Sequence, residues 1–376
     1  MLFGIVVGIA TGLIPALHIN QVANLLSSFK MPEHMLAFFL SLAITHSFLD
    51  FIPTILLGIP NEFTLLSTLP GYYFVQRGKA FYAVKLTLYG SLFAILFSVF
   101  LFPIYALLIN FSFDFLKLLA KPFLIFVISL LFFSERYKKY AFFAILASFT
   151  LGFISLKMLN LSNPFSPLII GFFPLSQCII GFISNEKFPK QKLTEDYFPE
   201  NAIFYAFLGF IAGMLSSIFA ILSPAQMAFV ISFFFGSTPS TFLITLGAIN
   251  TAYLFLSFIS AYAGFKPHSL IAIKAYEKFS FSLQELPLIF STGILTAFSA
   301  FAIGYFLAKF IIRKVSALEY STFSLLMLLF LITFVFLTSS FEGILLALSA
   351  AAVGLICTLS GVKKSHCMCF LLATFV

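Results

Sequence analysis

The chain has 376 residues, of which 61% are hydrophobic and 9% are charged, and its formal net charge is +8. Its mean hydropathy of +1.10 lies far outside the range of soluble domains, which carry about 25% charged residues, so a soluble globular protein is excluded. The excess of Lys and Arg is best explained by cytoplasmic loops that obey the positive-inside rule, and nucleic-acid binding is not expected.

Apolar stretches recur from one end of the chain to the other. Since about 20 helical residues cross a hydrocarbon core of ~30 Å, the sequence predicts an all-α, polytopic transmembrane helix bundle of about 10–12 spans in the lipid bilayer of the cell membrane. The expected spans are 2–28, 34–58, 86–110, 120–134, 141–158, 166–184, 202–222, 225–236, 239–264, 287–311, 319–338 and 343–361.

Basic loops suggest the orientation of the two halves. The loops at 135–139 and 186–200, and the pairs Arg313–Lys314 and Lys363–Lys364, are expected on the cytoplasmic side. Counting crossings from these loops puts Arg77, Lys79 and Lys85 inside, whereas Lys274 and Lys278 come out on the opposite side. This contrast indicates two inverted repeats, a common plan of secondary transporters.

The sequence itself supports the repeat weakly. Sliding residues 31–61 by 207 positions superposes Pro32 on Pro239 and Pro60 on Pro267, and a shift of 201 places Gly8 and Gly12 on Gly209 and Gly213. We therefore divide the chain into a first transmembrane repeat at 1–135, connecting spans with a cytoplasmic loop at 136–201, and a second transmembrane repeat at 202–376.

Two proline-broken segments are candidate substrate sites. Pro15 removes a backbone donor inside the first apolar run, and His18 and Asn20 follow at the same depth, so the break should line a cavity. Pro60 and Asn61 follow a short apolar element, where a half-helix could point its backbone N–H groups at an anion. The alternatives are that Pro15 ends a short span at the water interface and that Pro60 lies in an ordinary loop.

His46 and Asp50 are the candidate ion-coupling residues. They lie four positions apart in an apolar helix, so they share a face and can touch. Ionisable side chains inside a span are costly and suggest a proton or ion pathway. A structural hydrogen bond between two helices is the alternative interpretation.

Neither a cofactor nor a metal site is expected. The chain has four cysteines, and the spacing of His366, Cys367 and Cys369 matches no structural zinc pattern. A coupling ion, Na+ or H+, is the one small ion that the sequence leads us to expect.

Three motifs together resemble the large membrane subunit of tripartite tricarboxylate transporters, the TctA family. They are GIATGLIPALHIN at Gly8–Asn20, TILLGIPNE at Thr54–Glu62 and STLPGYYFVQRGKA at Ser67–Ala80. The chain departs from the family pattern at Ala16, Asn61 and Pro70, as expected of a divergent branch, for instance an archaeal one.

The resemblance implies a secondary carboxylate transporter that works with a small membrane subunit and an extracytoplasmic binding protein. Carried over by position, it would place Gly71 and Tyr72, together with Pro15, Asn20, Pro60 and Gly78, in the transport core.

Three functions are weighed. The first is a permease for a small organic anion, a di- or tricarboxylate, coupled to a proton or sodium gradient. The second is an intramembrane enzyme that uses His46 and Asp50 as acid and base, although GxSxG and HExxH motifs are missing from the sequence. The third is a membrane scaffold without transport, which gives no reason for breaks in the middle of spans.

Overall fold

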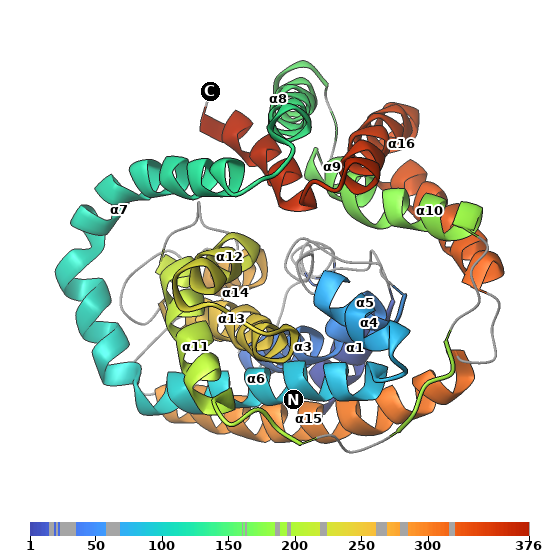
Figure 1. Ribbon diagram of the computed structural model, residues 1–376. Coiled ribbons are helices and arrows are strands. Elements are labelled where there is room, and N and C mark those ends of the chain that lie inside the picture. The colour runs from blue at the N-terminus through green and yellow to red at the C-terminus, as the bar shows by residue number, and fades with distance from the viewer. Residues whose placement is uncertain are drawn as a thin grey trace.

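The computed structural model consists of helices throughout the part of the chain that it describes (Figure 1). This part comprises residues 1–14, 19, 22, 35–57, 68–159, 161, 164–184, 189–193, 197–218, 224–260, 269–278, 285–315 and 320–375. The all-α prediction is confirmed. The helices in chain order are α1 (Leu2–Leu13), α3 (Leu36–Leu49), α4 (Phe51–Leu57), α5 (Thr68–Gln76), α6 (Ala80–Phe100), α7 (Phe102–Phe133), α8 (Lys138–Phe153), η3 (Ile154–Met158), α9 (Phe165–Ile170), η4 (Gly171–Leu175), α10 (Ser176–Ser184), α11 (Ala202–Ile218), α12 (Pro224–Phe235), α13 (Pro239–Ser260), α14 (Leu270–Lys278), α15 (Leu286–Val315), α16 (Tyr320–Ser360) and η7 (Lys364–Phe375).

Seven helical segments within the described ranges are long and apolar enough to cross a membrane. In an 18-residue apolar stretch of each span, 94% and 89% is buried for Leu36–Leu56 and Pro239–Ser260, whereas only 22% is buried for Ser324–Ser360. A polytopic bundle is therefore confirmed, with α3 and α13 at its centre and α16 at its periphery.

Two helix boundaries differ from the predicted spans. The predicted spans 86–110 and 120–134 are instead α6, which ends at Phe100, and one continuous α7, which contains Pro122. The break falls at Leu101 because Pro103 fits the first turn of a new helix but not the interior of an old one. The predicted break between 338 and 343 agrees with the non-helical backbone of Ser339 and Ser340 inside α16.

The helices pack as two bodies (Figure 1). We call α1, α3–α6 and α11–α15 the inner bundle, because most of their buried apolar side chains form one cluster. We call α8–α10, α16 and η7, with the short segments η3 and η4, the outer helices, because they form two clusters of their own. Helix α7 runs around the edge of the molecule from the inner bundle to the outer helices. The predicted domain boundaries at 135 and 201 stay a prediction.

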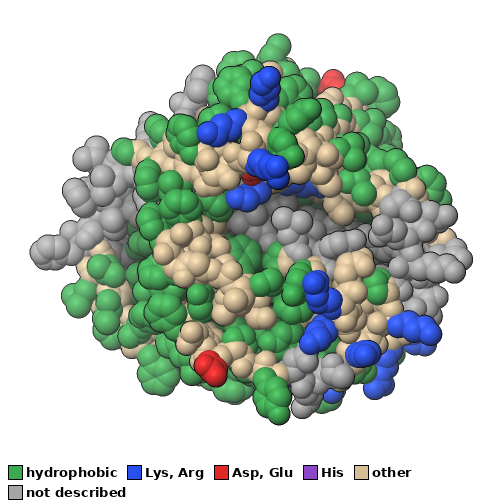
Figure 2. Space-filling view, viewed as in Figure 1, with side chains coloured by type: hydrophobic (Ala, Val, Ile, Leu, Met, Phe, Trp, Pro, Cys, Tyr) green, Lys and Arg blue, Asp and Glu red, His purple; other side chains and the backbone are tan. Residues whose placement is uncertain are grey.

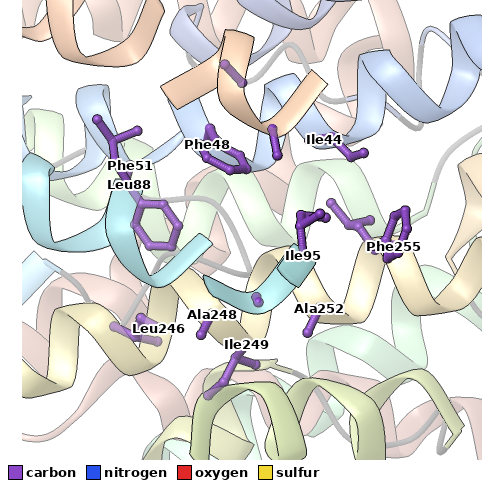
Figure 3. Packing of buried hydrophobic residues seen from close by; sticks show 14 of the residues in the cluster. Ile44, Phe48, Phe51, Leu88, Ile95, Leu246, Ala248, Ile249, Ala252 and Phe255 are labelled. Carbon is purple, nitrogen blue, oxygen red and sulfur yellow. The ribbon is translucent and has the colours of Figure 1, made fainter. Parts of the chain in front are cut away.

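Helices α3, α6 and α13 meet at the centre of the inner bundle (Figure 3). Phe48 of α3, Ile95 of α6 and Phe255 of α13 are fully buried there, and Gly90 of α6 contacts the carbonyl of Ile244. Such close backbone approach is what holds helices together in lipid, where burying apolar side chains gives little driving force.

Two parallel helix pairs in the inner bundle use the same glycine packing. A methyl group on Gly8 of α1 would lie 2.7 Å from Thr45 Cβ, and Gly4 meets Ser41 one turn earlier, so α1 and α3 run side by side in the same direction. In the second pair, the same added group on Gly209 and Gly213 of α11 would lie 2.7 Å from Ala248 Cβ and Ala252 Cβ of α13, respectively.

The residues that face these glycines keep the predicted offset of 207, since 248 − 41 and 252 − 45 both equal 207. The glycines themselves correspond at an offset of 205, since 209 − 4 and 213 − 8 both equal 205. The predicted offset of 201 for Gly8 and Gly12 is therefore wrong by about one helical turn.

The basic loops gather in two groups (Figure 2). Lys192 N donates to Gly78 O at 2.7 Å, which joins the segment 189–193 to the turn before α6. Lys363 N donates to Glu135 Oε1 at 3.1 Å, which joins the end of α16 to the loop before α8. The loops within each of these two pairs therefore lie on one side of the molecule, as the charge pattern predicts.

Replacing Gly8 with Ala should destabilise the protein. The added methyl group would clash with Thr45 Cβ at 2.7 Å and Leu42 O at 2.9 Å, and overpacking of this kind costs about 1–3 kcal/mol. Ala is the better helix former by about 1 kcal/mol, so any loss reports packing. We expect Gly8→Ala to lower the midpoint of thermal unfolding in detergent, whereas Val6→Leu, which adds one carbon on the exposed face of α1, should not.

Candidate functional site

His46 and Asp50 lie one turn apart at the C-terminal end of α3, in the inner bundle. His46 Nε2 lies 3.9 Å from Asp50 Oδ2, and the two side chains are only 2% and 3% exposed. The predicted proximity of these residues is confirmed. An ionisable pair buried at this depth needs partners, because lipid and apolar side chains cannot solvate a charge.

Asp50 is held from the second half of the chain. Asn250 of α13 donates its Nδ2–H to Asp50 Oδ2 at 3.1 Å. One turn earlier, the hydroxyls of Ser47 and Thr251 lie 3.1 Å apart. Two polar contacts therefore join α3 to α13 within otherwise apolar surfaces.

His46 is held from α1. Its Nδ1 lies 3.2 Å from Thr11 Oγ1, and the Thr11 hydroxyl donates to Gly8 O at 3.2 Å. We call these side chains the polar layer, which consists of Thr11, His46, Ser47, Asp50, Asn250 and Thr251. It connects α1, α3 and α13, and so joins both halves of the chain.

Sequence reasoning missed Thr11, Asn250 and Thr251. Asn250 was detectable, since it is an amide in the middle of the apolar span Pro239–Ser260 and is 1% exposed. Buried amides in spans pair with other polar side chains, so an unmatched Asn in one half and an Asp in the other half point to each other.

Most of the predicted substrate-binding residues lie outside the described residues: Pro15, His18, Asn20, Pro60 and Asn61. Gly71 and Tyr72 belong to α5, and the side chain of Tyr72 also lies outside the described part. Gly71 is buried against α4, where an added Cβ would lie 3.2 Å from Ile55 Cα. Helix α5 therefore packs closely on the helix that follows Asp50.

A second polar cluster lies among the outer helices, beyond the end of α16. Glu135 Oε1 accepts the backbone N–H of Lys363 at 3.1 Å and lies 3.3 Å from His366 Nε2. Burial lowers the pKa of His366, against the opposing effect of Glu135, so the imidazole is neutral at pH 7 and donates Nε2–H. These contacts fix the C-terminal helix η7 to the loop before α8.

Lys364 belongs to the same cluster. Its Nζ donates to Ser176 Oγ at 2.8 Å, and burial lowers the pKa of Lys364 from its ordinary value of 10.5 to about 8. Cys357 Sγ and Cys367 Sγ lie 3.6 Å apart nearby as free thiols. Within the described ranges, no group of three or more His, Cys, Asp or Glu side chains could hold a metal ion.

Replacing Asn250 with Leu should destabilise the inner bundle. The substitution keeps the branched shape and the number of side-chain heavy atoms but removes the donor to Asp50, and losing a partner of a buried polar group costs about 1–3 kcal/mol, more if the group is charged. We expect a clearly lower midpoint of thermal unfolding in detergent. A double-mutant cycle with Asp50→Asn should then show coupling between the two positions.

Ser257→Ala is the matched control for this substitution. Ser257 is also fully buried on α13, but its hydroxyl donates to Tyr253 O of its own helix at 2.7 Å. If Asn250→Leu unfolds at the same temperature as Ser257→Ala, the contact to Asp50 does not stabilise the bundle.

Lys364→Met should change stability in a pH-dependent way. The folded protein penalises the charged form of Lys364, and this penalty is fully present below pH 8 and disappears as the pH rises to 10.5. The unfolding temperature of the variant relative to the wild type should therefore be highest below pH 8 and fall as the pH increases. Lys139→Met, at an exposed lysine, is the control.

Comparisons with known proteins agree with the motifs near the N-terminus. The sequence matches the family described as the tripartite tricarboxylate transporter TctA family over residues 1–369. It is 24% identical over 383 residues to the uncharacterized protein MJ1079 of Methanocaldococcus jannaschii, an alignment that covers 98% of this chain and 95% of that protein. No solved structure matches the sequence. Because the match extends over almost the whole chain, the protein belongs to the TctA family and is a multi-pass membrane component of a transporter, not an enzyme.

Proposed function

We propose that this chain is the permease of a secondary transporter in the cell membrane, and that it carries a small organic anion, a di- or tricarboxylate. A proton or sodium gradient would drive it, with His46 and Asp50 handling the coupling ion. The anion would be bound by Pro15, His18, Asn20, Pro60, Asn61, Gly71 and Tyr72, the residues at the proline breaks and on α5.

The observation that supports this proposal best is the position of the polar layer. Asp50 and Asn250 contact each other across α3 and α13, which are among the most buried spans. An ion that binds to Asp50 changes the net charge at this contact. Because the contact joins the two halves of the chain, ion binding can change how the halves pack, which is what coupling requires.

The proposal extends to partners. Membership of the tripartite tricarboxylate transporter family implies partner subunits and a binding protein. We propose that this chain works with a small membrane subunit and an extracytoplasmic binding protein that delivers the anion.

Counterflow of labelled citrate into proteoliposomes tests the transport function. The protein, reconstituted together with the small membrane subunit and the binding protein, should exchange internal citrate for external label without a gradient, and an ion gradient should drive net accumulation. Asp50→Asn should keep citrate binding but reduce gradient-driven accumulation at least about tenfold, within the usual range of coupling free energies.

Glu135→Gln is the control, because Glu135 is also a buried carboxylate but lies in the outer cluster. It should leave accumulation unchanged. If the wild-type protein, reconstituted with its partner subunits, gives no counterflow with citrate or any other di- or tricarboxylate, the chain is not a carboxylate permease and a scaffold role takes its place.

A further inference from the structure

We infer that the ion held by the polar layer is a proton shared between His46 Nε2 and Asp50 Oδ2, with Thr11 and Asn250 as the positioning residues. This inference rests on the transport function proposed above, because it names the coupling ion. It goes further by assigning a role to each contact of the polar layer.

Thr11 fixes the tautomer of His46. The Thr11 hydroxyl uses its hydrogen to donate to Gly8 O at 3.2 Å, so towards His46 Nδ1, also at 3.2 Å, it offers a lone pair. Nδ1 must then carry the imidazole proton. In the neutral ring, this leaves the lone pair at Nε2, on the side of Asp50.

Two acceptors therefore face each other. The Nε2 lone pair and the Asp50 carboxylate oxygen are 3.9 Å apart, and both side chains are at least 97% buried. Two acceptors at this separation do not attract each other until one proton enters between them and makes either an imidazolium–carboxylate pair or a neutral acid next to a neutral ring. The pair takes up this proton from water on one side of the membrane and releases it on the other.

Asn250 can serve both states of Asp50. Its Nδ2–H donates to the carboxylate in the arrangement observed, and among the described residues its Oδ1 has no hydrogen-bond partner. If Asp50 is the protonated partner, a half-turn of the amide lets Oδ1 accept the acid proton instead. The contact between the two halves thus persists while its polarity reverses.

The imidazole nitrogen of His46 next to Asp50 favours a proton over sodium as the coupling ion. Hard cations are bound by oxygen ligands, whereas an imidazole nitrogen suits softer metals. Here two of the groups next to Asp50 Oδ2 are an imidazole nitrogen and an amide N–H donor, neither of which is an oxygen ligand.

Titratable side chains on the helices that pack on α3 also bear on the pair. Among the described residues of the helices that pack on α3, α1 and α4 have none and α13 has only Tyr253. The others lie on α6, α14 and α15: Tyr82, Lys85, Tyr89, Lys274, Tyr276, Glu277, Lys278, Tyr305, Lys309, Arg313 and Lys314. Lys274 pairs with Glu277 at 2.9 Å, and Lys309 Nζ lies 4.4 Å from the centre of the Tyr305 ring. Lys85 is buried, so it is kept in every variant used below.

Infrared titration of the purified protein in detergent tests this inference without any need for transport. As the pH falls, the wild type should show either a carboxyl C=O band or an imidazolium ring band that is missing in Asp50→Asn and has the same midpoint in sodium chloride and in potassium chloride. Thr11→Val removes the hydroxyl that fixes the tautomer of His46. Nε2 of His46 can then carry the ring proton and donate a hydrogen bond to the Asp50 carboxylate. The midpoint should then move to lower pH by about one unit, the value of one hydrogen bond to a charged group. Thr11→Ser should restore it.

Three results would overturn the inference: a midpoint that shifts with sodium, the absence of any titrating carboxyl or imidazolium band that depends on Asp50, or a Thr11→Val variant that titrates like the wild type. If Asp50→Asn does not fold, the comparison of Thr11→Val with Thr11→Ser decides. Citrate counterflow is measured with the same protein reconstituted with its partner subunits, so a proton site without counterflow refutes the transport function, and counterflow without a proton site refutes this inference.

Discussion

The close approach of helix backbones at α13 is the constraint on which the rest of the inner bundle depends. Gly209 and Gly213 bring α11 onto one side of α13, and Gly90 of α6 meets it at Ile244. In lipid, such contacts replace the hydrophobic effect as the source of stability. They also exclude water, so polar side chains on α3 and α13 bond to carbonyls of their own helix, as Ser257 does, or to each other, as Asp50 and Asn250 do.

The polar layer follows from this exclusion of water. Asp50, buried beside α13, requires a donor, and Asn250 provides it. The same burial makes the energy of the contact depend on the charge of the carboxylate, because a charge in a low-dielectric environment is worth far more than one in water. The contact between Asp50 and Asn250 therefore both stabilises the bundle and responds to ion binding.

How much of this could be read from the sequence depended on the kind of interaction. Helices α3, α13 and α15 were predictable because an apolar run of about 20 residues is long enough to span the bilayer. The pair His46 and Asp50 was predictable because a helix places residues four apart on one face. The continuity of α7 through Pro122 was not, since a proline inside an apolar run normally ends or kinks a helix. The contacts of Asn250 with Asp50 and of Gly4 with Ser41 depend on how two helices slide along each other, and the spacing within one helix does not define that register.

The outer helices have a consequence for biogenesis. Helices α8, α9 and α10 come from the middle of the chain, yet their two apolar clusters are completed by α16 and η7, which are synthesised after them. During insertion the middle helices therefore stay in the bilayer without these partners until α16 and η7 have left the ribosome. A nascent chain that stops before α16 would leave α8, α9 and α10 without the helix that completes their clusters.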